Sequence, residues 1–247
     1  MNDGVWFTRL TLKRGDRAIA PLIQELAFSD PGASMTVAHR LMWTIAAPDT
    51  RAAFDRDNPD RADRAAILWR EAEMGRKFYI LGPLPADSSD ILRIETKPFS
   101  LAFRPGDALA FDLRLNATVA RKGEPGRRSS RSDVAMDRMR AEEAAAQMAG
   151  AEIAGRAERR LKAAEGAAAE WLSRVGARDG FSLRGVKLDA YRVETLPRRG
   201  RSAKIGVCDL RGALDVTDGE RFLARILAGF GRAKAFGCGL MLLRRRR

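Results

Sequence analysis

The second half of the chain carries an ordered series of segments whose hydrophobic period changes, and this order restricts the folds that it can adopt. Residues 109–119 place an apolar side chain at every second position, as a half-buried strand does. A helical stretch rich in Ala, Glu and Arg follows, then two strands, a capped helix and a last strand. The segments are 133–176, 181–196, 204–216, 218–228 and 240–243. Strand, helix, strand, strand, helix, strand is the order of a ferredoxin-like α+β sandwich.

The first half offers the same order less clearly. Its segments are a strand at 5–12, a helix from an N-cap at Ser34 to about Ala46, a hairpin of strands 66–74 and 77–81, and an extended stretch at 91–103. A loop that contains Pro21, Pro31 and Gly32 precedes the helix, and a second helix must fit into residues 83–90. We therefore expect an α+β fold of tandem ferredoxin-like (RRM-like) domains, with antiparallel sheets and helices on one face. The domains are expected at 1–96 and 97–247.

The charge of the chain favours an anionic polymer as partner. There are 45 Lys and Arg against 32 Asp and Glu, a formal net charge of +13, and each phosphate that such a protein neutralises releases counterions. The excess of Arg and Ala also permits a compositional origin for part of this charge. The only two cysteines allow no disulfide framework, and no apolar run has the length of a membrane span. We expect a cytoplasmic protein with no signal peptide, membrane association, cofactor or metal site.

His39 is the only histidine. On a helical wheel, the apolar residues around it fall on the core side, whereas Thr36, His39, Arg40 and Trp43 fall on the opposite side. An arginine and an indole beside an imidazole offer a phosphate contact and a surface on which a base can stack. A surface histidine with no role is the alternative interpretation.

RNA requires little from a protein that cuts it. Its 2′-OH can attack the adjacent phosphorus and leave a 2′,3′-cyclic phosphate and a 5′-OH. An imidazole can accept or donate the proton near neutral pH, and cations or backbone N–H groups can stabilise the charge on the phosphorane. One histidine cannot perform both proton transfers in a single step, so a second group or the substrate geometry must contribute.

Two further regions are candidate binding sites. The loop 229–239, GFGRAKAFGCG, frees the backbone for close approach to a ligand and carries two cations; a structural turn is the alternative. The segments 121–132 and 197–201 are basic and aperiodic, and we expect the first to be a mobile loop. Cys238 and Trp171 are expected to be packed core residues, and most charges of the long helical stretch to lie on its solvated face. Breaks in that stretch are expected near Gly150, Gly155 and Gly166.

Three segments together resemble one family. They are AHRLMW (38–43), RSAKIGVCDLRGALDVTD (201–218) and GFGRAKAFGCGLMLL (229–243). The chain resembles the CasE family of CRISPR repeat-processing endoribonucleases of type I-E systems, in the RAMP superfamily. The glycine-rich run before the last strand is the most specific of the three. The resemblance covers the first strand and helix, residues around 109–119 and about the last 45 residues.

The resemblance implies an antiviral-defence nuclease that performs crRNA processing. Such an enzyme cuts CRISPR repeat hairpin RNA without metal, retains the product hairpin, and works with other subunits of a type I-E surveillance complex. The family's catalytic histidine falls on His39, its basic residues after the penultimate loop fall on Arg201 and Lys204, and its tyrosine three positions before the histidine is Thr36 here. The expected catalytic residues are thus His39, Lys204 and Thr36. The expected RNA-binding residues are Arg40, Trp43, Arg121, Lys122, Arg127, Arg128, Arg131, Arg198, Arg199, Arg201, Ser202, Gly229, Gly231, Arg232, Lys234 and Gly237.

Two other functions stay open at this stage. The absence of tyrosine at Thr36 permits a non-catalytic subunit that binds RNA hairpins within a ribonucleoprotein. A basic structural protein of a ribosome-like assembly is the third hypothesis, but such a protein has no use for His39 and Trp43 on the non-core side of a helix.

Overall fold

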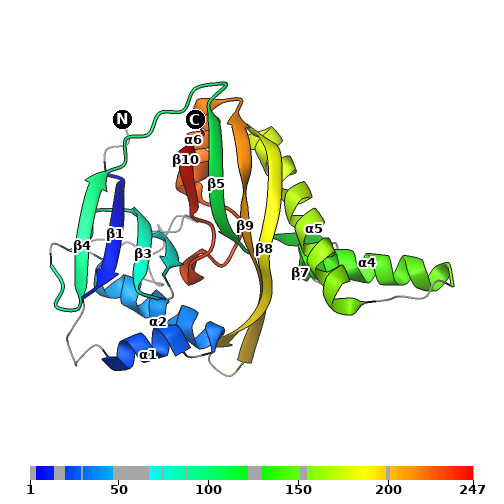
Figure 1. The fold of residues 1–247 in the computed structure, drawn as a ribbon, viewed down its shortest axis with the longest axis horizontal. Coiled ribbons are helices and arrows are strands. Elements are labelled where there is room, and N and C mark those ends of the chain that lie inside the picture. The colour runs from blue at the N-terminus through cyan, green and yellow to red at the C-terminus, as the bar shows by residue number, and fades with distance from the viewer. Residues whose placement is uncertain are drawn as a thin grey trace.

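The computed structural model divides the chain into two modules, each built on a four-stranded antiparallel sheet (Figure 1). It describes residues 4–13, 20–28, 30–46, 67–73, 75–86, 88–121, 130–150, 155–198 and 201–246. In the first module the elements are β1 (Trp6–Leu12), α1 (Ala20–Phe28), α2 (Pro31–Thr44), β2 (Leu68–Ala72), β3 (Lys77–Gly82) and β4 (Leu92–Pro98). In the second they are β5 (Ala108–Leu115), β6 (Thr118–Arg121), β7 (Ser130–Asp133), α4 (Val134–Met148), α5 (Arg156–Asp179), β8 (Phe181–Arg198), β9 (Arg201–Val216), α6 (Gly219–Ala228), η2 (Lys234–Phe236) and β10 (Met241–Arg245).

The two sheets share one topology. Their orders are β2-β3-β1-β4 and β10-β5-β9-β8, so in each module the first strand lies between the third and the fourth. This is the ferredoxin-like arrangement, and the expected α+β fold of tandem ferredoxin-like domains is confirmed. β4 ends at Pro98 and β5 begins at Ala108. The domain division near residue 97 stays a prediction.

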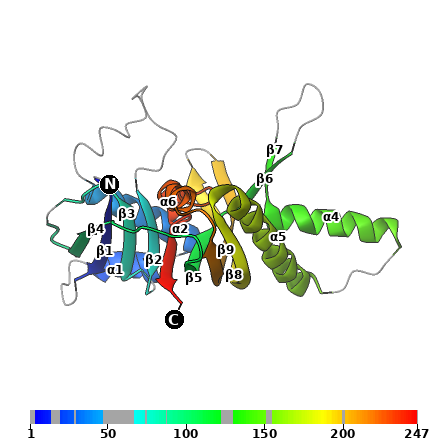
Figure 2. The ribbon, with the colours of Figure 1, turned by 90° about the horizontal axis from the view of Figure 1, so that it is seen from above.

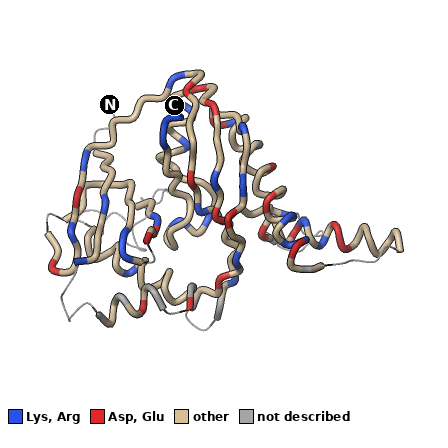
Figure 3. Tube along the Cα trace, viewed as in Figure 1, with Lys and Arg blue, Asp and Glu red and all other residues tan. Residues whose placement is uncertain are grey.

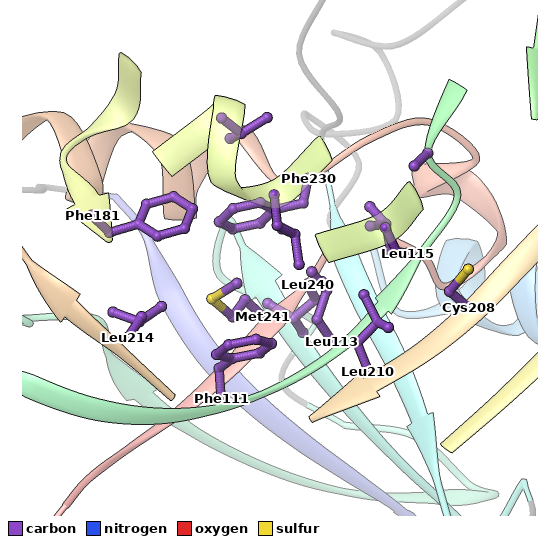
Figure 4. Packing of buried hydrophobic residues seen from close by; sticks show 14 of the residues in the cluster. Phe111, Leu113, Leu115, Phe181, Cys208, Leu210, Leu214, Phe230, Leu240 and Met241 are labelled. Atoms are coloured by element: carbon purple, nitrogen blue, oxygen red, sulfur yellow. The ribbon is translucent and has the colours of Figure 1, made fainter. Parts of the chain in front are cut away.

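The core of the second module follows from the alternation along β5. Its burial alternates at every residue, and the inward side chains pack under the Ala-rich face of α5 and under α6. Figure 4 shows these side chains between the helices and the sheet, with Phe111, Leu113 and Leu115 from β5 beside Leu210 and Leu214 from β9. Small residues on α5 let that helix approach the sheet closely, and the same cluster includes Leu68 and Leu81 of the first module. The apolar core therefore continues across the junction between the modules.

The helical stretch expected at 133–176 is two helices. α4 begins at the N-cap Asp133, whose carboxylate accepts hydrogen bonds from the Ala135 and Met136 amides at 3.0 Å each. The break lies near Gly150 and Gly155, as expected, but not at Gly166, which lies inside α5 where it packs against Arg138 of α4. Seen from above, α4 projects away from both sheets, and the β6–β7 hairpin rises beside it (Figure 2).

Two expectations for the first module are wrong. Residues 83–86 and 88–90 form no helix, because this stretch carries two prolines and pairs with the end of α2: Pro85 bridges Ala46, and the Ala86 N–H donates to the Ile45 carbonyl at 2.8 Å. The stretch expected to be a loop contains α1, since Pro21 lies in the first turn, where a missing N–H costs nothing.

The expected cap of the next helix is also wrong. Asp30 caps α2, with its carboxylate accepting from the Gly32 amide at 2.9 Å, and Pro31 occupies the first helical turn. Ser34 lies inside the helix and donates to the Leu26 carbonyl of α1 at 2.8 Å. This bond ties α1 to α2 and fixes the start of the helix that carries His39.

Candidate functional site

His39 lies where the two modules meet. Ala38, Leu41 and Met42 on the same helix are buried against the first sheet, as the wheel predicts. The opposite face of α2 is only partly open to solvent: Arg40 is exposed, whereas Thr36, His39 and Trp43 are half-buried. It packs on the second module, so that His39 is half-buried with its ring 5.4 Å from the ring of Phe236 in η2.

The surroundings of His39 favour its neutral form. Its pKa lies below the ordinary value of 6.5, chiefly because burial penalises the charged ring and also because Arg40 is close by. A hydrogen bond to the backbone of Ala235 opposes this shift without cancelling it. At neutral pH the ring is therefore a base that is ready to accept a proton.

Trp43 fixes one nitrogen of that ring. Its indole Nε1–H donates to His39 Nε2 at 3.3 Å, and the two rings meet edge to face with centroids 6.2 Å apart. Since Nε2 accepts this bond, the neutral ring carries its proton on Nδ1. Trp43 lies one turn from His39 as expected, and in this structure its polar edge is turned to the imidazole.

The loop 229–239 is the element that brings the second module to His39. Gly237 has φ +77° and lies so close to Trp69 that a Cβ there would be 2.7 Å from the indole ring. Trp69 in turn donates its Nε1–H to the Ala235 carbonyl at 3.1 Å. The loop is thereby clamped onto β2 of the first module, and Phe236 is held against His39.

The other glycines of the loop also serve close packing. A Cβ at Gly229 would lie 2.6 Å from Leu68, and one at Gly231 would lie 2.5 Å from the Asn116 carbonyl. Lys234 donates through Nζ to the Ala228 carbonyl at 2.6 Å, and burial lowers its pKa; its expected contact with RNA stays a prediction. The structural role that we left open for this loop is therefore present.

Cys238 is a packed residue, as expected. It is fully buried in a small cluster beneath α2 with Met35, Leu196 and Val207. Burial raises the pKa of its thiol to about 12, so the thiol stays protonated at neutral pH.

The remaining expected catalytic residues lie on elements next to His39. Thr36 is half-buried one turn before it on α2, and its hydroxyl donates to the Gly32 carbonyl at 2.9 Å. Lys204 is exposed on β9, paired with Thr195 on β8. The Thr195 carbonyl touches Gly32 at the start of α2, where a Cβ would lie 2.1 Å from it. The β8–β9 hairpin thus runs directly beside the helix of His39.

The basic segments are only partly described. Arg198 and Arg201 pair across the tip of the β8–β9 hairpin, and Ser202 follows in β9, whereas Arg199 lies outside the described residues. Residues 122–129, with Lys122, Arg127 and Arg128, also lie outside them. The flanks of the expected mobile loop 121–132 are the paired strands β6 and β7, which carry Arg121 and Arg131. Arg121 forms an ion pair with Asp137, and Arg40 and Arg131 are exposed.

Sequence reasoning missed Phe236, Trp69 and the Ala235 carbonyl. Phe236 and the Ala235 backbone contact His39, and Trp69 acts on them by bonding the Ala235 carbonyl. The only signal for them in the sequence is the glycine spacing that lets the loop approach. Trp171 is half-buried rather than fully packed, and one side of it lines a pocket. In the part of the chain that the structure describes, no three His, Cys, Asp or Glu side chains could hold a metal ion. No described helix is both long and apolar enough to cross a bilayer.

The sequence matches the model of a family described as "CRISPR associated protein" over residues 5–245. No curated protein matches the chain in sequence.

Solved structures share the fold. The structure of Thermus thermophilus Cse3 bound to an RNA that represents a pre-cleavage complex has a TM-score of 0.61 and 23% identity, covering 98% of this chain and 99% of that one. Cas6e from Escherichia coli K-12 has a TM-score of 0.56 and 17% identity, covering 98% and 100%. A chain of a CRISPR RNA-guided surveillance complex has a TM-score of 0.57 and 16% identity, with the same coverage.

Proposed function

Since this chain belongs to the family of CRISPR-associated proteins, we propose that it is an endoribonuclease that cuts CRISPR repeat hairpin RNA and uses His39 as the general base. Family membership agrees with the resemblance seen in its three sequence motifs. The observation that carries the proposal is the half-buried, neutral imidazole at the junction of the modules, beside Arg40 and the basic β8–β9 hairpin.

The chemistry follows from the state of the ring. A neutral imidazole with a pKa below 6.5 can take the proton from the 2′-OH as that oxygen attacks the phosphorus. The P–O5′ bond then breaks, leaving a 2′,3′-cyclic phosphate and a 5′-OH. Nε2 is the nitrogen without a proton, and Trp43 donates to it in the free protein. Substrate must therefore displace or share this hydrogen bond.

Charge on the phosphorane requires cations at the same place. Arg40 is exposed one residue from His39, and Lys204 is exposed on the strand pair beside α2. We assign Arg40 to phosphate binding and Lys204 to charge stabilisation or to protonation of the leaving 5′-oxygen. Thr36, where the family has tyrosine, has its hydroxyl committed to the helix backbone. We infer that it positions the helix rather than transfers a proton.

The proposed partners are the repeat hairpin and a surveillance complex. Lys and Arg run along strands of both sheets with Asp and Glu interleaved (Figure 3), so hairpin recognition must combine phosphate contacts from several elements. A-form RNA stems are bound mostly by shape and backbone. The Cse3 structure with RNA and the surveillance-complex chain share this fold, which supports hairpin binding and retention of the product in a complex.

The decisive experiment incubates a labelled repeat-hairpin RNA with the protein in EDTA. The proposal expects one cut per hairpin with a 2′,3′-cyclic phosphate end, and no cut when the nucleotide at that position is 2′-deoxy. His39→Ala is expected to lose cleavage by about 10²–10⁴-fold and to keep hairpin binding.

Arg93→Ala is the matched control, because Arg93 is exposed on the edge strand β4 and belongs to neither α2 nor the β8–β9 hairpin. It should cut at the wild-type rate. Cleavage by His39→Ala at the wild-type rate would contradict the assignment of the site. Wild-type protein that binds the hairpin in a gel shift and never shortens it would favour the non-catalytic RNA-binding subunit instead.

A further inference from the structure

A second basic site lies at the end of the helix layer of the second module. It is a pocket of about 280 Å³ between the β6–β7 hairpin, the last turns of α5, α6 and the start of the loop 229–239. Four arginines line it, Arg131, Arg178, Arg225 and Arg232, and Trp171 is its aromatic lining residue. The residues that contact the His39 ring, namely Trp43, Ala235 and Phe236, do not line this pocket.

Two of the four arginines have structural partners. Arg178 donates to both carboxylate oxygens of Asp179 at 2.9 Å, and Arg225 Nε donates to the same carboxylate at 2.6 Å. Arg225 also donates to the Gly229 carbonyl at 3.2 Å, at the end of α6. These bonds neutralise Asp179 and satisfy a helix end, so this pair sets the shape of the pocket.

The other two arginines are available to a ligand. Among the described residues, no ion pair includes Arg131 or Arg232. The backbone of Arg232 is fixed, because its N–H donates to the Asn116 carbonyl at 2.9 Å. Arg131 is exposed in β7. Arg131 and Arg232 thus offer two guanidinium groups without an ion-pair partner. The carboxylate of Asp179 is already bonded to Arg178 and Arg225, so the positive charge of the pocket favours anions.

The shape and the aromatic wall narrow the ligand further. A volume of about 280 Å³ is just below the roughly 300–1,000 Å³ of small-molecule sites, so the pocket suits one nucleotide rather than several. An indole wall offers stacking to a base, but a base within a duplex has both faces covered. An unpaired nucleotide alone presents a phosphate and a free base face together.

We propose that this pocket binds one unpaired nucleotide next to the repeat hairpin, with its base on Trp171 and its phosphate between Arg131 and Arg232. The inference rests on the proposed function, because it needs a hairpin substrate with single-stranded flanks. The loop 229–239 connects the two sites: Arg232 lies at the pocket, and Phe236 contacts His39. A nucleotide held here anchors the unpaired strand on the same loop that positions the catalytic ring.

The test measures binding of three RNAs that carry 2′-deoxyribose at the cut position, namely a bare hairpin and hairpins with two unpaired nucleotides on the 5′ or the 3′ side. For the wild type, one flank should strengthen binding about tenfold, as one stacked base does. In Arg131→Glu/Arg232→Glu this gain should vanish. The control, Arg93→Glu/Arg244→Glu, makes the same charge change at two exposed arginines and should keep the gain.

The proposal is overturned if the pocket variant keeps the gain, or if neither flank strengthens wild-type binding while the bare hairpin binds. Failure of the bare hairpin to bind any of the proteins would instead refute the proposed function. A second measurement needs no variant: a flank carrying 4-thiouridine, irradiated in the complex with wild-type protein, should cross-link to Trp171. A cross-link only to residues outside the pocket contradicts the proposal.

Discussion

His39 is held by contacts from both modules, and these contacts set its protonation state. Burial between α2 and η2 lowers its pKa, while the Ala235 backbone limits the shift. Trp43 contributes a hydrogen bond that only the neutral ring can accept. Because the chain contains one histidine, its titration gives a single set of imidazole resonances, and each contribution can be measured separately.

Trp43→Phe keeps an aromatic ring and removes the donor to His39 Nε2. The pKa of His39 should rise toward 6.5, since the neutral form loses a hydrogen bond that the imidazolium never had. An NMR titration of the imidazole in free protein measures this. Trp6→Phe in β1 is the matched control and should leave the titration unchanged; a pKa that falls in Trp43→Phe would disprove the role of the indole.

For the contacts of His39, the sequence predicted the neighbour on the same helix and none of the neighbours from the other module. His39 and Trp43 are four apart, so helical geometry alone places them together. Phe236 and Ala235 belong to the other module, and no local pattern connects them to His39. Lys234 has a structural role that the sequence did not indicate, because its ammonium group donates to the Ala228 carbonyl in the folded loop.

Among the elements, the loop 229–239 matters most because it connects the second module to α2. Gly237→Ala should destabilise the protein by about 1–2 kcal/mol from the left-handed backbone and by about 1–3 kcal/mol more from the clash with Trp69. Displacement of Phe236 should also reduce cleavage more than hairpin binding. Urea unfolding and single-turnover cleavage measure the two effects.

Gly150→Ala is the control that separates the cost of the left-handed backbone from the cost of the clash with Trp69. Gly150 has φ +62°, and a Cβ there has no neighbour within 4 Å. This variant should therefore lose only the stability that the left-handed backbone conformation costs. It should cut RNA normally. Equal loss of stability in the two variants would mean that the Trp69 contact does not hold the loop.

Elements with a clear hydrophobic periodicity could be predicted from the sequence. Elements whose conformation depends on one or two prolines could not. The alternation in β5 and the cap at Asp218 both appear in the structure, where Asp218 accepts from the Arg221 amide at 3.0 Å. α1 was missed because Pro21 suggests a loop unless it occupies a first turn. The stretch 83–90 lacks a helix because its prolines favour extended pairing with the end of α2.

Across the whole molecule, ion pairs join the two sheets at their junction. Arg70 of β2 bonds Asp112 of β5 at 2.6 Å, and Arg114 of β5 lies 3.7 Å from Glu71 and 2.9 Å from Asp209. The order of strands within each module could be predicted, because the same pattern occurs twice. The way in which the modules meet could not, because it depends on these side chains and on the loop.

Removing a largely buried partner should cost far more than removing an exposed one. Arg114→Met, at a side chain 18% exposed, should lower the free energy of unfolding by about 2–4 kcal/mol, since Asp209 then stays buried without that partner. Arg9→Met breaks a pair with Glu95 that is 47% and 43% exposed and should cost under about 1 kcal/mol. Urea unfolding of both variants gives the comparison; similar values would show that the junction pairs are dispensable.

The net charge of +13 also predicts strong salt dependence. If six to ten phosphates are contacted, affinity for the hairpin should fall by roughly 10³–10⁵-fold between 50 and 200 mM salt. Anisotropy titrations at several salt concentrations measure the slope. A nearly flat response would contradict recognition through the phosphate backbone.

The central claim is that the neutral ring of His39 takes the proton, and the pH dependence of single-turnover kcat/KM tests it most directly. A base with a lowered pKa is active above that pKa, so the rate should fall as pH drops through a value below 6.5. That kinetic pKa should equal the NMR pKa of His39 in the free protein, and both should rise together in Trp43→Phe. A rate that falls with rising pH across this range would contradict this claim. So would a kinetic pKa that stays unchanged in Trp43→Phe while the NMR pKa of His39 rises.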